Sequence, residues 1–463
     1  MHPVPAHATG EVVGDVLEAV GHAPTLAVLF VTQPLTGTFD DIADSVQRML
    51  QPEHLVAVTT GGVLGAGSEV EDGSALALWA VRGGSVETFL LPGSPLIEEN
   101  GFGYEAVLDH AQHHDGYVYR ALPCSAESSG LVLLADADSF DVPSWLAAQN
   151  PQLPIAGARF GGPIRTRRER RQGEVRSDDA LPAPAALAAS NVVYRNGTKS
   201  VGGALAVAFG PEFTFRTLVS QNCRPIGQPF TVTKAERNVV YAMGGHLATA
   251  ALDLTVEICD DNERMLLRQG IHLGVVVNAG VGLRRVAVDG HDAGSEVSTQ
   301  SISALTVGDR DEAPLAGVEP NGFGIGDFVV HQVLGADRNA GAIAVAGSCE
   351  VGDIVQFQVT DAAAARSECL QVLAEALDLN RPTASHHSTV GALLFPSVSR
   401  GTNFFGIEHH DAAAVAEFST VCSAGAFCAI QLGPRGDVTG QHENSLTIAL
   451  VHAAPPRTGS PDV

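Results

Sequence analysis

One order of elements, a buried strand, an amphipathic helix and a second buried strand, recurs three times along this chain. In the first copy, TLAVLFVTQ (25–33) is apolar throughout and bounded by prolines, which is typical of a strand buried on both faces. The segment 40–50 places Ile42, Val46, Met49 and Leu50 on one helical face, and HLVAVTTGG follows as the second strand. A strand-helix-strand crossover is right-handed, so we expect the two strands of each copy to be parallel.

The two later copies are predicted from their pattern, because their residues do not match those of the first. GLVLLADADS, a short helix over 142–149 and PIAGARFGG form the second copy. TVGALLFPSVSRG, a helix over 411–422 and AFCAIQLGP form the third. Further strands follow within ALALWAVRGGSVETFLLPG, GGALAVAFG and ENSLTIALVHA, and the first of these is expected to be a hairpin around Gly83 and Gly84. The chain therefore predicts an α/β fold with mixed sheets, built from repeated βαββ-like units and covered by helices.

The region between the second and third copies is rich in short strands. PFTVT and NVVYAM are interpreted as a hairpin, although Thr233 and Glu236 form a capping-box pattern that could begin a helix instead. A further helix is expected over 361–377, and another over 11–20 near the start of the chain.

The chain is too acidic for nucleic acid or an anionic membrane surface to be a first expectation. Asp and Glu number 52 and Lys and Arg 27, which gives a formal net charge of −25 over 463 residues. No run approaches the roughly 18 to 20 apolar residues of a membrane span, and residues 1–20 lack the pattern of a secretion signal. Seven cysteines without a CxxC pair indicate reduced thiols. We therefore expect a cytoplasmic protein without nucleic-acid or membrane partners.

Sequence motifs of catalysis and cofactor binding are absent. The chain has no GxGxxG, GxSxG, HExxH or P-loop. His110 and His114, within 109–115, have the spacing of a metal pair on a helix, but solvated histidines are the favoured interpretation. The same interpretation is given to His409 and His410. We therefore expect no metal and no cofactor, and we assign no catalytic residue.

An arginine-rich segment, 163–190, contrasts with the acidic chain around it. The favoured interpretation is a surface loop with a solvated run of charge, and the alternative is a docking patch for an acidic partner or for an acidic face of this chain. Its clustered arginines are Arg165, Arg167, Arg168, Arg170, Arg171 and Arg176.

Several stretches together carry a family resemblance. In the C-terminal half they are QNCRPIGQPFTVTKAERNVVY, GDFVVHQVLGADRNAGAIAVAGSCEVGDIVQFQVTDAAAA, LLFPSVSRGTNFFG, GAFCAIQLGP and QHENSLTIALV. In the N-terminal half they are LVAVTTGGVLG and EVEDGSALALWAV. Over 26–451 the chain resembles the F-box and intracellular signal transduction domain family, FIST, and Arg400-Gly401 matches an Arg-Gly of its pattern.

The chain departs from the family pattern near its expected ligand loops. Ile430-Gln431 stands where the closing loop usually has Gly-Glu, and Gly62-Val63 stands where a Gly-Glu follows the Thr-Thr pair. Ser397 replaces a frequent cysteine, and Ser399 replaces the first glycine of a Gly-Arg-Gly triplet. The first two changes each remove a carboxylate, so the resemblance leaves the identity of the ligand open.

The resemblance implies a sensory module that binds a small metabolite, an amino acid or another carboxylate, and signals through a protein partner. Because both halves use up the length, a stand-alone sensor is expected. The implied divisions are an N-terminal helical extension over 1–23, a FIST N-terminal domain over 24–216, a FIST C-terminal domain over 217–453 and a tail over 454–463.

The candidate ligand site follows from the fold class, because α/β folds bind ligands at the carboxyl ends of parallel strands. Those ends are the loops at 59–62, 161–162 and 397–403. Arg400 is the preferred anchor, since a guanidinium can pair with a carboxylate through two hydrogen bonds; the alternative is an internal salt bridge. The predicted ligand contacts are Arg400, Thr59, Thr60, Ser399, Asn403, Gln431 and His442.

Three hypotheses on function follow. The favoured one is a cytoplasmic sensor that binds a small ligand without catalysis. The second is a hydrolase or transferase whose dispersed residues, among them Cys124, Ser397 or a histidine, meet in the fold. The third is a component of a protein assembly that uses the acidic surface and the arginine-rich segment.

Overall fold

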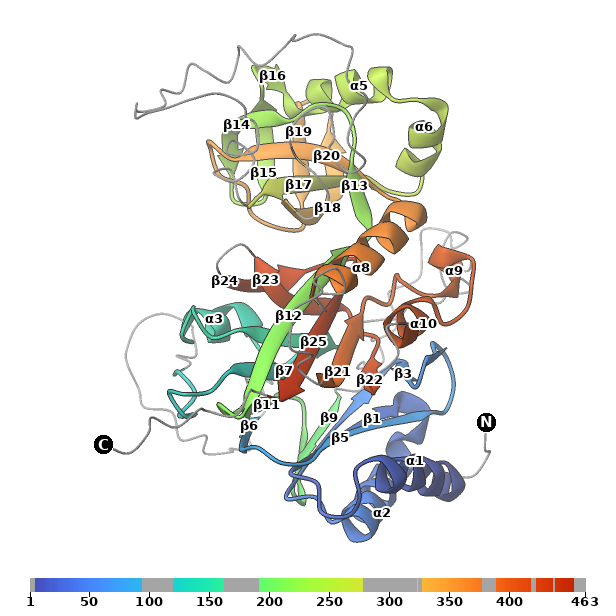
Figure 1. Ribbon diagram of the computed structural model, residues 1–463. Helices are drawn as coiled ribbons and strands as arrows, with labels where there is room; N and C mark the ends of the chain where they lie inside the picture. The colour runs from blue at the N-terminus through green and yellow to red at the C-terminus, as the bar shows by residue number, and fades with distance from the viewer. Residues whose placement is uncertain are drawn as a thin grey trace, which may run out of the picture. The chain divides into compact units, whose positions relative to one another are not determined.

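The computed structural model describes residues 5–93, 120–161, 191–277, 323, 327–376, 389–417, 422–435 and 438–453. These residues form two compact units, of which the first comprises 1–222 and 362–463 and the second comprises 223–361 (Figure 1). The arginine-rich segment and the histidines of 109–115 lie outside the described residues.

Three β-sheets make up the first compact unit. In strand order, the first sheet is β10 (Thr198–Val201), β9 (Val192–Arg195), β2 (His54–Thr60), β1 (Leu26–Thr32) and β5 (Leu76–Val81). The second is β24 (Val438–His442), β23 (Ile430–Arg435), β8 (Ile155–Phe160), β7 (Gly130–Asp136), β11 (Ala204–Phe209) and β6 (Val86–Leu91). The third is β4 (Ser68–Val70), β3 (Val63–Gly65), β22 (Ser423–Ala426), β21 (Thr389–Pro396), β25 (Ser445–Ala453) and β12 (Phe213–Gln221).

Helices join and cover these sheets. The described helices of the first compact unit are α1 (Pro5–Ala19), the 3-10 helix η1 (Gln33–Thr38), α2 (Phe39–Leu50), α3 (Val142–Ala147), α8 (Ala362–Ala376), α9 (Thr402–Phe405) and α10 (His410–Glu417). In α2, Ile42, Val46 and Leu50 are buried, as their spacing predicts. Met49, expected on the same face, is exposed instead.

Each sheet is built around one repeat with the same strand order. The repeats are β1–α2–β2–β5 (repeat I), β7–α3–β8–β11 (repeat II) and β21–α10–β22–β25 (repeat III). In each, the first two strands pair in parallel and the last strand pairs antiparallel with the first. The α/β class is therefore confirmed, as are the parallel strand pairs expected in the first two copies. In the third copy the expected second strand, AFCAIQLGP, is wrong: β21 pairs in parallel with β22, whereas β23, which takes up most of that stretch, pairs antiparallel with β8 in the second sheet.

The repeats exchange hairpins in a closed cycle. Within each repeat, a two-stranded hairpin lies between the second parallel strand and the last strand, but it pairs in the sheet of another repeat. The β3–β4 hairpin of repeat I joins β22 of repeat III, β23–β24 of repeat III joins β8 of repeat II, and β9–β10 of repeat II joins β2 of repeat I. No sheet is complete without a neighbouring repeat.

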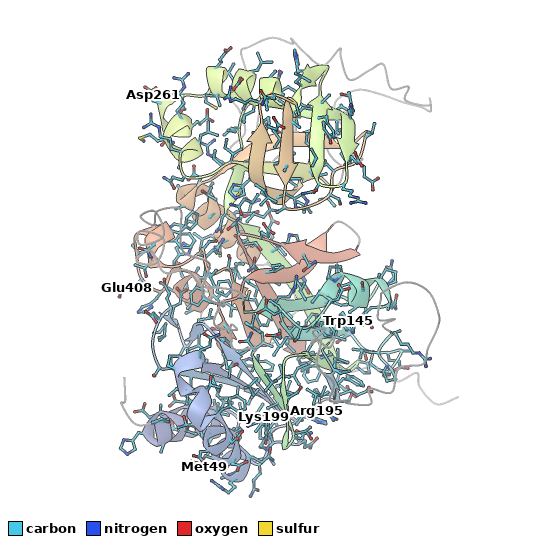
Figure 2. The ribbon with its side chains drawn as sticks, turned by 180° about the vertical axis from the view of Figure 1, so that it is seen from behind. Met49, Trp145, Arg195, Lys199, Asp261 and Glu408 are labelled. Carbon is cyan, nitrogen blue, oxygen red and sulfur yellow. The ribbon has the colours of Figure 1, made fainter. Side chains whose placement is uncertain are left out.

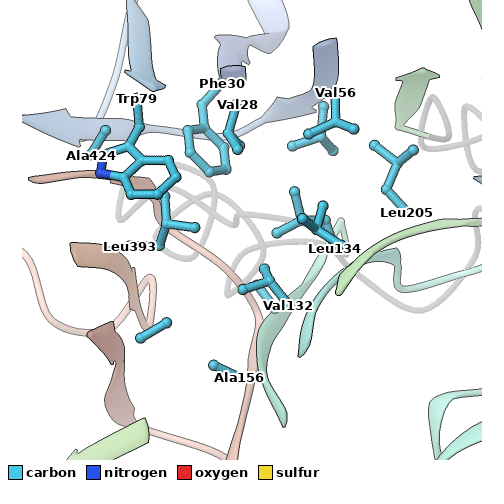
Figure 3. Packing of buried hydrophobic residues seen from close by; sticks show 14 of the residues in the cluster. Val28, Phe30, Val56, Trp79, Val132, Leu134, Ala156, Leu205, Leu393 and Ala424 are labelled. Atoms are coloured by element: carbon cyan, nitrogen blue, oxygen red, sulfur yellow. The ribbon is translucent and has the colours of Figure 1, made fainter. Parts of the chain in front are cut away.

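A common core lies between the three sheets. Figure 3 shows side chains from all three pointing toward one another, among them Phe30 and Trp79 of repeat I, Leu134 of repeat II, and Leu393 and Ala424 of repeat III. The opposite face of each sheet packs on helices of its own: α1 and α2 on the first, α3 on the second, and α8 and α10 on the third. Burial on both faces explains why β1 and β7 are apolar along their whole length.

The hairpin expected around Gly83 and Gly84 is wrong. Both glycines have positive φ and turn the chain, but β5 then pairs with β1 in the first sheet while β6 pairs with β11 in the second. The turn therefore carries the chain from one sheet to the next instead of closing a hairpin.

The second compact unit contains a closed barrel. Its strands, in order, are β13 (Cys223–Pro225), β20 (Ile354–Thr360), β14 (Phe230–Glu236), β15 (Val239–Met243), β19 (Ala342–Val345), β18 (Phe328–Asp337) and β17 (His272–Val276), with β16 (His246–Leu247) on β15. Because β17 also pairs with β20, the strands from β20 to β17 form a ring. Its helices are α5 (Ala248–Ile258) and α6 (Asp261–Leu267).

The hairpin interpretation of PFTVT and NVVYAM is confirmed, since β14 and β15 pair antiparallel in place of the alternative helix. The division at 216/217 between two FIST domains stays a prediction. The compact units divide the chain differently, with the second unit inserted between β12 and α8 of the first.

Gly425→Ala should destabilise the first compact unit, because a Cβ at Gly425 would lie 1.8 Å from the carbonyl oxygen of its β21 partner Leu394. We expect the free energy of unfolding to fall by about 1–3 kcal/mol, measured by chemical denaturation. Gly14→Ala in α1 is the control: nothing lies within 4 Å of its Cβ, and removing a helical glycine should add roughly 0.5–1 kcal/mol. Equal stability of Gly425→Ala and the parent would contradict this packing.

Candidate functional site

Arg400 lies in the loop between β21 and α9, and its side chain is fully enclosed. The loop turns tightly here, because the Arg400 amide donates to the carbonyl of Ser397 over 2.9 Å. This turn directs the guanidinium inward, under α10. The sequence correctly predicts a loop at 397–403, but the inward direction of the Arg400 side chain depends on its hydrogen-bond acceptors, which are described next.

Every nitrogen of the guanidinium has a partner. Nε and Nη2 each donate to the carboxylate of Asp411 over 2.7 Å, and Nη1 donates to the side-chain oxygen of Asn222. Burial alone would raise the pKa of Asp411, but the charge and hydrogen bonds of Arg400 hold it below its ordinary value. The internal salt bridge, the alternative interpretation of Arg400, is therefore present.

Two rings close the space around this pair. The His410 ring stacks on Phe405 with centroids 3.5 Å apart, and the Arg400 guanidinium lies 5.1 Å from the centroid of the same Phe405 ring. His410 Nδ1 is 2.9 Å from Asp411 Oδ1. The two histidines at 409–410 are thus not both solvated, since His410 is buried in this cluster.

Two further carboxyl groups surround the pair. Glu368 of α8 accepts from the Gln221 amide and the Ser220 hydroxyl, and burial raises the pKa of Glu368 to about 7 although Arg400 acts against the shift. Glu69 of β4 accepts from the amide of Ala412, and burial raises its pKa to about 7. We call Arg400, Asp411, His410, Asn222 and Glu368 the Arg400 network.

The other predicted contacts divide into three groups, of which the third, Thr59 and Thr60, is described in the next paragraph. Ser399 and Asn403 are exposed beside Arg400, and the Ser399 hydroxyl donates to Asn444 over 2.9 Å. Gln431 is buried, accepts from the Ser445 hydroxyl and donates to the carbonyl of Cys428, while His442 on β24 is hydrogen-bonded to the carbonyl of Pro434. Direct ligand contact by any of these residues stays a prediction.

Thr59 and Thr60 belong to a different polar centre, at the end of β2. Thr60 donates to the carbonyl of Gly62, and the Thr59 hydroxyl accepts from the Val192 amide over 2.8 Å. Thr59 also lies 3.5 Å from Asn191, which donates to the fully buried carboxylate of Asp136. Thr59 thus connects the first sheet with Asp136 of the second through Asn191. The guanidinium of Arg400 pairs instead with Asp411 and Asn222, so the two threonines belong to a separate polar cluster.

An open cavity of about 490 Å³ lies elsewhere in the first compact unit. Its walls are α1, the β3–β4 hairpin, β5 and the start of β22, and we call it the β5 groove. Most lining side chains are aliphatic, and Asp15 is the one Asp, Glu, Lys, Arg or His of its lining. Cavities of 300–1,000 Å³ are typical of binding sites.

The described part of the chain shows no group of three or more His, Cys, Asp or Glu side chains arranged to hold a metal ion. Within the same residues, no helix is long and apolar enough to span a membrane. The hydroxyl oxygen of Ser397, one of the dispersed residues proposed for an enzyme, lies 2.9 Å from that of Ser399.

Comparison with known proteins gives the class and then the family. The FIST N domain model matches residues 25–246, and the FIST C domain model matches residues 251–434. These domains define a family of signal-transduction sensory modules. The chain belongs to the FIST family, as its sequence resemblance predicts.

The similar curated proteins come from mycobacteria. An uncharacterized protein of Mycobacterium bovis is 28% identical over 434 residues, which cover 94% of this chain and 92% of the relative. An uncharacterized protein of Mycobacterium tuberculosis is 28% identical over 441 residues, with the same coverage of both chains.

Sequence reasoning missed most of the Arg400 network. Glu368 occupies the buried face of α8 with Ala365, Cys369 and Leu373, and its i, i+3 spacing from Ala365 was a usable signal. Asn222 and Asp411 give no signal of this kind. Asn222 is 178 residues from Arg400 in sequence, and no periodic pattern connects Asp411 with Arg400 across the loop and α9.

Asp411→Asn should destabilise the first compact unit strongly, because it leaves the buried Arg400 charge without its carboxylate. We expect a loss of about 3–5 kcal/mol of unfolding free energy in chemical denaturation. Asp40→Asn is the control: Asp40 pairs with Lys199, labelled in Figure 2, but both side chains are substantially exposed and the loss should stay below about 1 kcal/mol. Similar losses in both variants would show that burial of the Arg400 pair has little effect.

Glu368 and Glu69 should make a contribution to stability that falls as pH rises from about 5 to 7.5, because the native state holds protons on both carboxyl groups that the unfolded chain has released. The raised pKa values mean that this contribution is complete below about pH 4.5 and is lost as pH passes 7. Glu368→Gln keeps an acceptor for Gln221 and should make the fall in melting temperature smaller. Glu375→Gln, at an exposed position of the same helix, should follow the parent; an unchanged slope in Glu368→Gln would contradict this assignment.

Proposed function

We propose that this protein is a sensory module that acts by binding, without catalysis, and that engages a protein partner through the β5 groove. Membership in a family of signal-transduction sensory modules supports the first part. The second part rests on one observation: the β5 groove is an open, mostly aliphatic cavity at the free edge of a sheet. Such surfaces are typical of interaction sites.

A small carboxylate held by Arg400 has less support from the geometry. Each guanidinium nitrogen already has a partner, and Asp411 and Glu368 place acidic groups beside it. A second anion there would meet these groups in a low-dielectric interior. The β5 groove does not suit a carboxylate either, because its lining includes no cationic side chain. The amino-acid-like ligand therefore stays a prediction, separate from the groove.

The Arg400 network has a position suited to relaying a signal within the first compact unit. It holds Asn222 and Gln221, where the chain leaves this unit, and Glu368 of α8, which follows its return. A change in the protonation or packing of Glu368 would therefore be felt at both segments. This supports a sensory role without requiring a reaction.

The groove can be tested with a neutral apolar dye, Nile red, on the full chain. We expect saturable binding at one site, and Ala19→Trp should weaken it by about tenfold or more because Ala19 is exposed on α1 and lines the groove. The control is Ala6→Trp, which adds the same side chain at an exposed position of α1 outside the groove. Circular dichroism checks that both variants fold.

If Nile red shows no saturable binding, or binds Ala19→Trp and the parent equally, the β5 groove is not the binding site and this part of the proposal is contradicted. An environment-sensitive fluorophore on Cys422, an exposed cysteine of the groove, gives an independent readout after Cys124→Ser. Its emission should shift when the dye binds and should not shift in Ala19→Trp.

A further inference from the structure

Among the described residues, the sheet of repeat I has no counterpart of one strand that the sheets of repeats II and III possess. In the second sheet, β6 pairs with β11, the last strand of repeat II. In the third sheet, β12 pairs with β25, the last strand of repeat III. The equivalent strand of the first sheet, β5, pairs with β1 alone among the described strands and leaves its other edge free.

The unfilled position coincides with the β5 groove. Strand β6 lies against β9, a hairpin strand from repeat II, and β12 lies against β23, a hairpin strand from repeat III. By the same rule, a sixth strand beside β5 would lie against β3, the hairpin strand from repeat I. Strands β5 and β3 form two walls of the groove.

The chain's own continuation is poorly suited to this position. Strands β6 and β12 follow directly after the last strands of repeats I and II, so the corresponding residues after β25 are 454–463. This segment contains Pro455, Pro456 and Pro461, which cannot donate a backbone hydrogen bond, and its other residues are mostly polar or small. The aliphatic lining of the groove therefore favours a segment with more apolar residues than 454–463 contains.

We propose that an extended segment of a partner protein adds to the free edge of β5 as the sixth strand of this sheet. The proposal rests on the proposed function of the groove and specifies its occupant. A free strand edge presents unpaired N–H and C=O groups, which an added strand satisfies, while pockets select its alternate side chains. The segment carries apolar residues at every second position, to face the aliphatic lining.

The negative charge of this chain restricts the charge that the partner segment can carry. The chain has a formal net charge of −25, and Asp15 is the charged side chain of the groove lining. An acidic segment would be repelled, whereas a neutral or basic one is favoured. Strand β12, FTFRTLVSQ, which fills the equivalent position beside β25, has one arginine and no acidic residue.

The test uses a synthetic peptide FTFRTLVSQ with blocked ends, labelled with a fluorophore, and the full chain. We expect saturable binding by fluorescence anisotropy and a loss of about tenfold or more in Ala19→Trp, with Ala6→Trp unchanged. Two N-methylated peptides then test the binding mode, one modified at the second, fourth and sixth residues and the other at the third, fifth and seventh. Because alternate N–H groups of a strand point to opposite sides, one set should lose about tenfold or more and the other should bind normally.

The outcomes separate this inference from the proposed function. If Nile red binds the groove but the peptide does not, or if both methylated peptides bind alike, strand addition is overturned and the groove remains a binding site. If neither probe binds, both proposals fail. A dimer in light scattering that Ala19→Trp dissolves would identify a second copy as the occupant and overturn the partner. A variant truncated after Ala453 gives one more outcome. If it binds the peptide more tightly than the full chain does, residues 454–463 occupy the position beside β5, and the proposal of a partner protein is overturned.

Discussion

The exchange of hairpins between repeats is the constraint on which the first compact unit depends. Each sheet takes its two inner parallel strands from one repeat and an edge hairpin from another. The inner faces of all three sheets then share one core. A single repeat would leave a sheet edge unpaired and one face of each strand in water, so we infer that the three repeats are stable together and not singly.

The Arg400 network adds a polar constraint to this apolar arrangement. A buried ion pair contributes little net stability, but its geometry is demanding, because an unpaired charge in the interior is costly. Here the demand falls on three segments: Asn222 after β12 and Asp411 of α10 must both meet the loop after β21 for every nitrogen of Arg400 to have a partner. The site predicted to hold a ligand is therefore also a site that fixes the register of the fold.

Sequence reasoning predicts those parts of the structure that local patterns determine. The apolar run of β1, the stripe of α2 and the parallel pairing of each repeat follow from periodicity and crossover rules. The separation of β5 from β6 does not, because Gly83 and Gly84 allow a turn of either kind and the choice depends on distant partners. For the same reason Arg400 is predicted as an important residue, whereas its pairing with Asp411 and Asn222 is not.

The free edge of β5 has a simple origin in connectivity. A linear polymer with three repeats has two links between them, and in this chain each link doubles as an extra strand, β6 after repeat I and β12 after repeat II. Closing the three repeats around a shared interior would require a third link, which a chain with two ends does not have. A cyclic arrangement of repeats made from a linear chain therefore leaves one strand edge unpaired, and here that edge lies where repeats I and III meet.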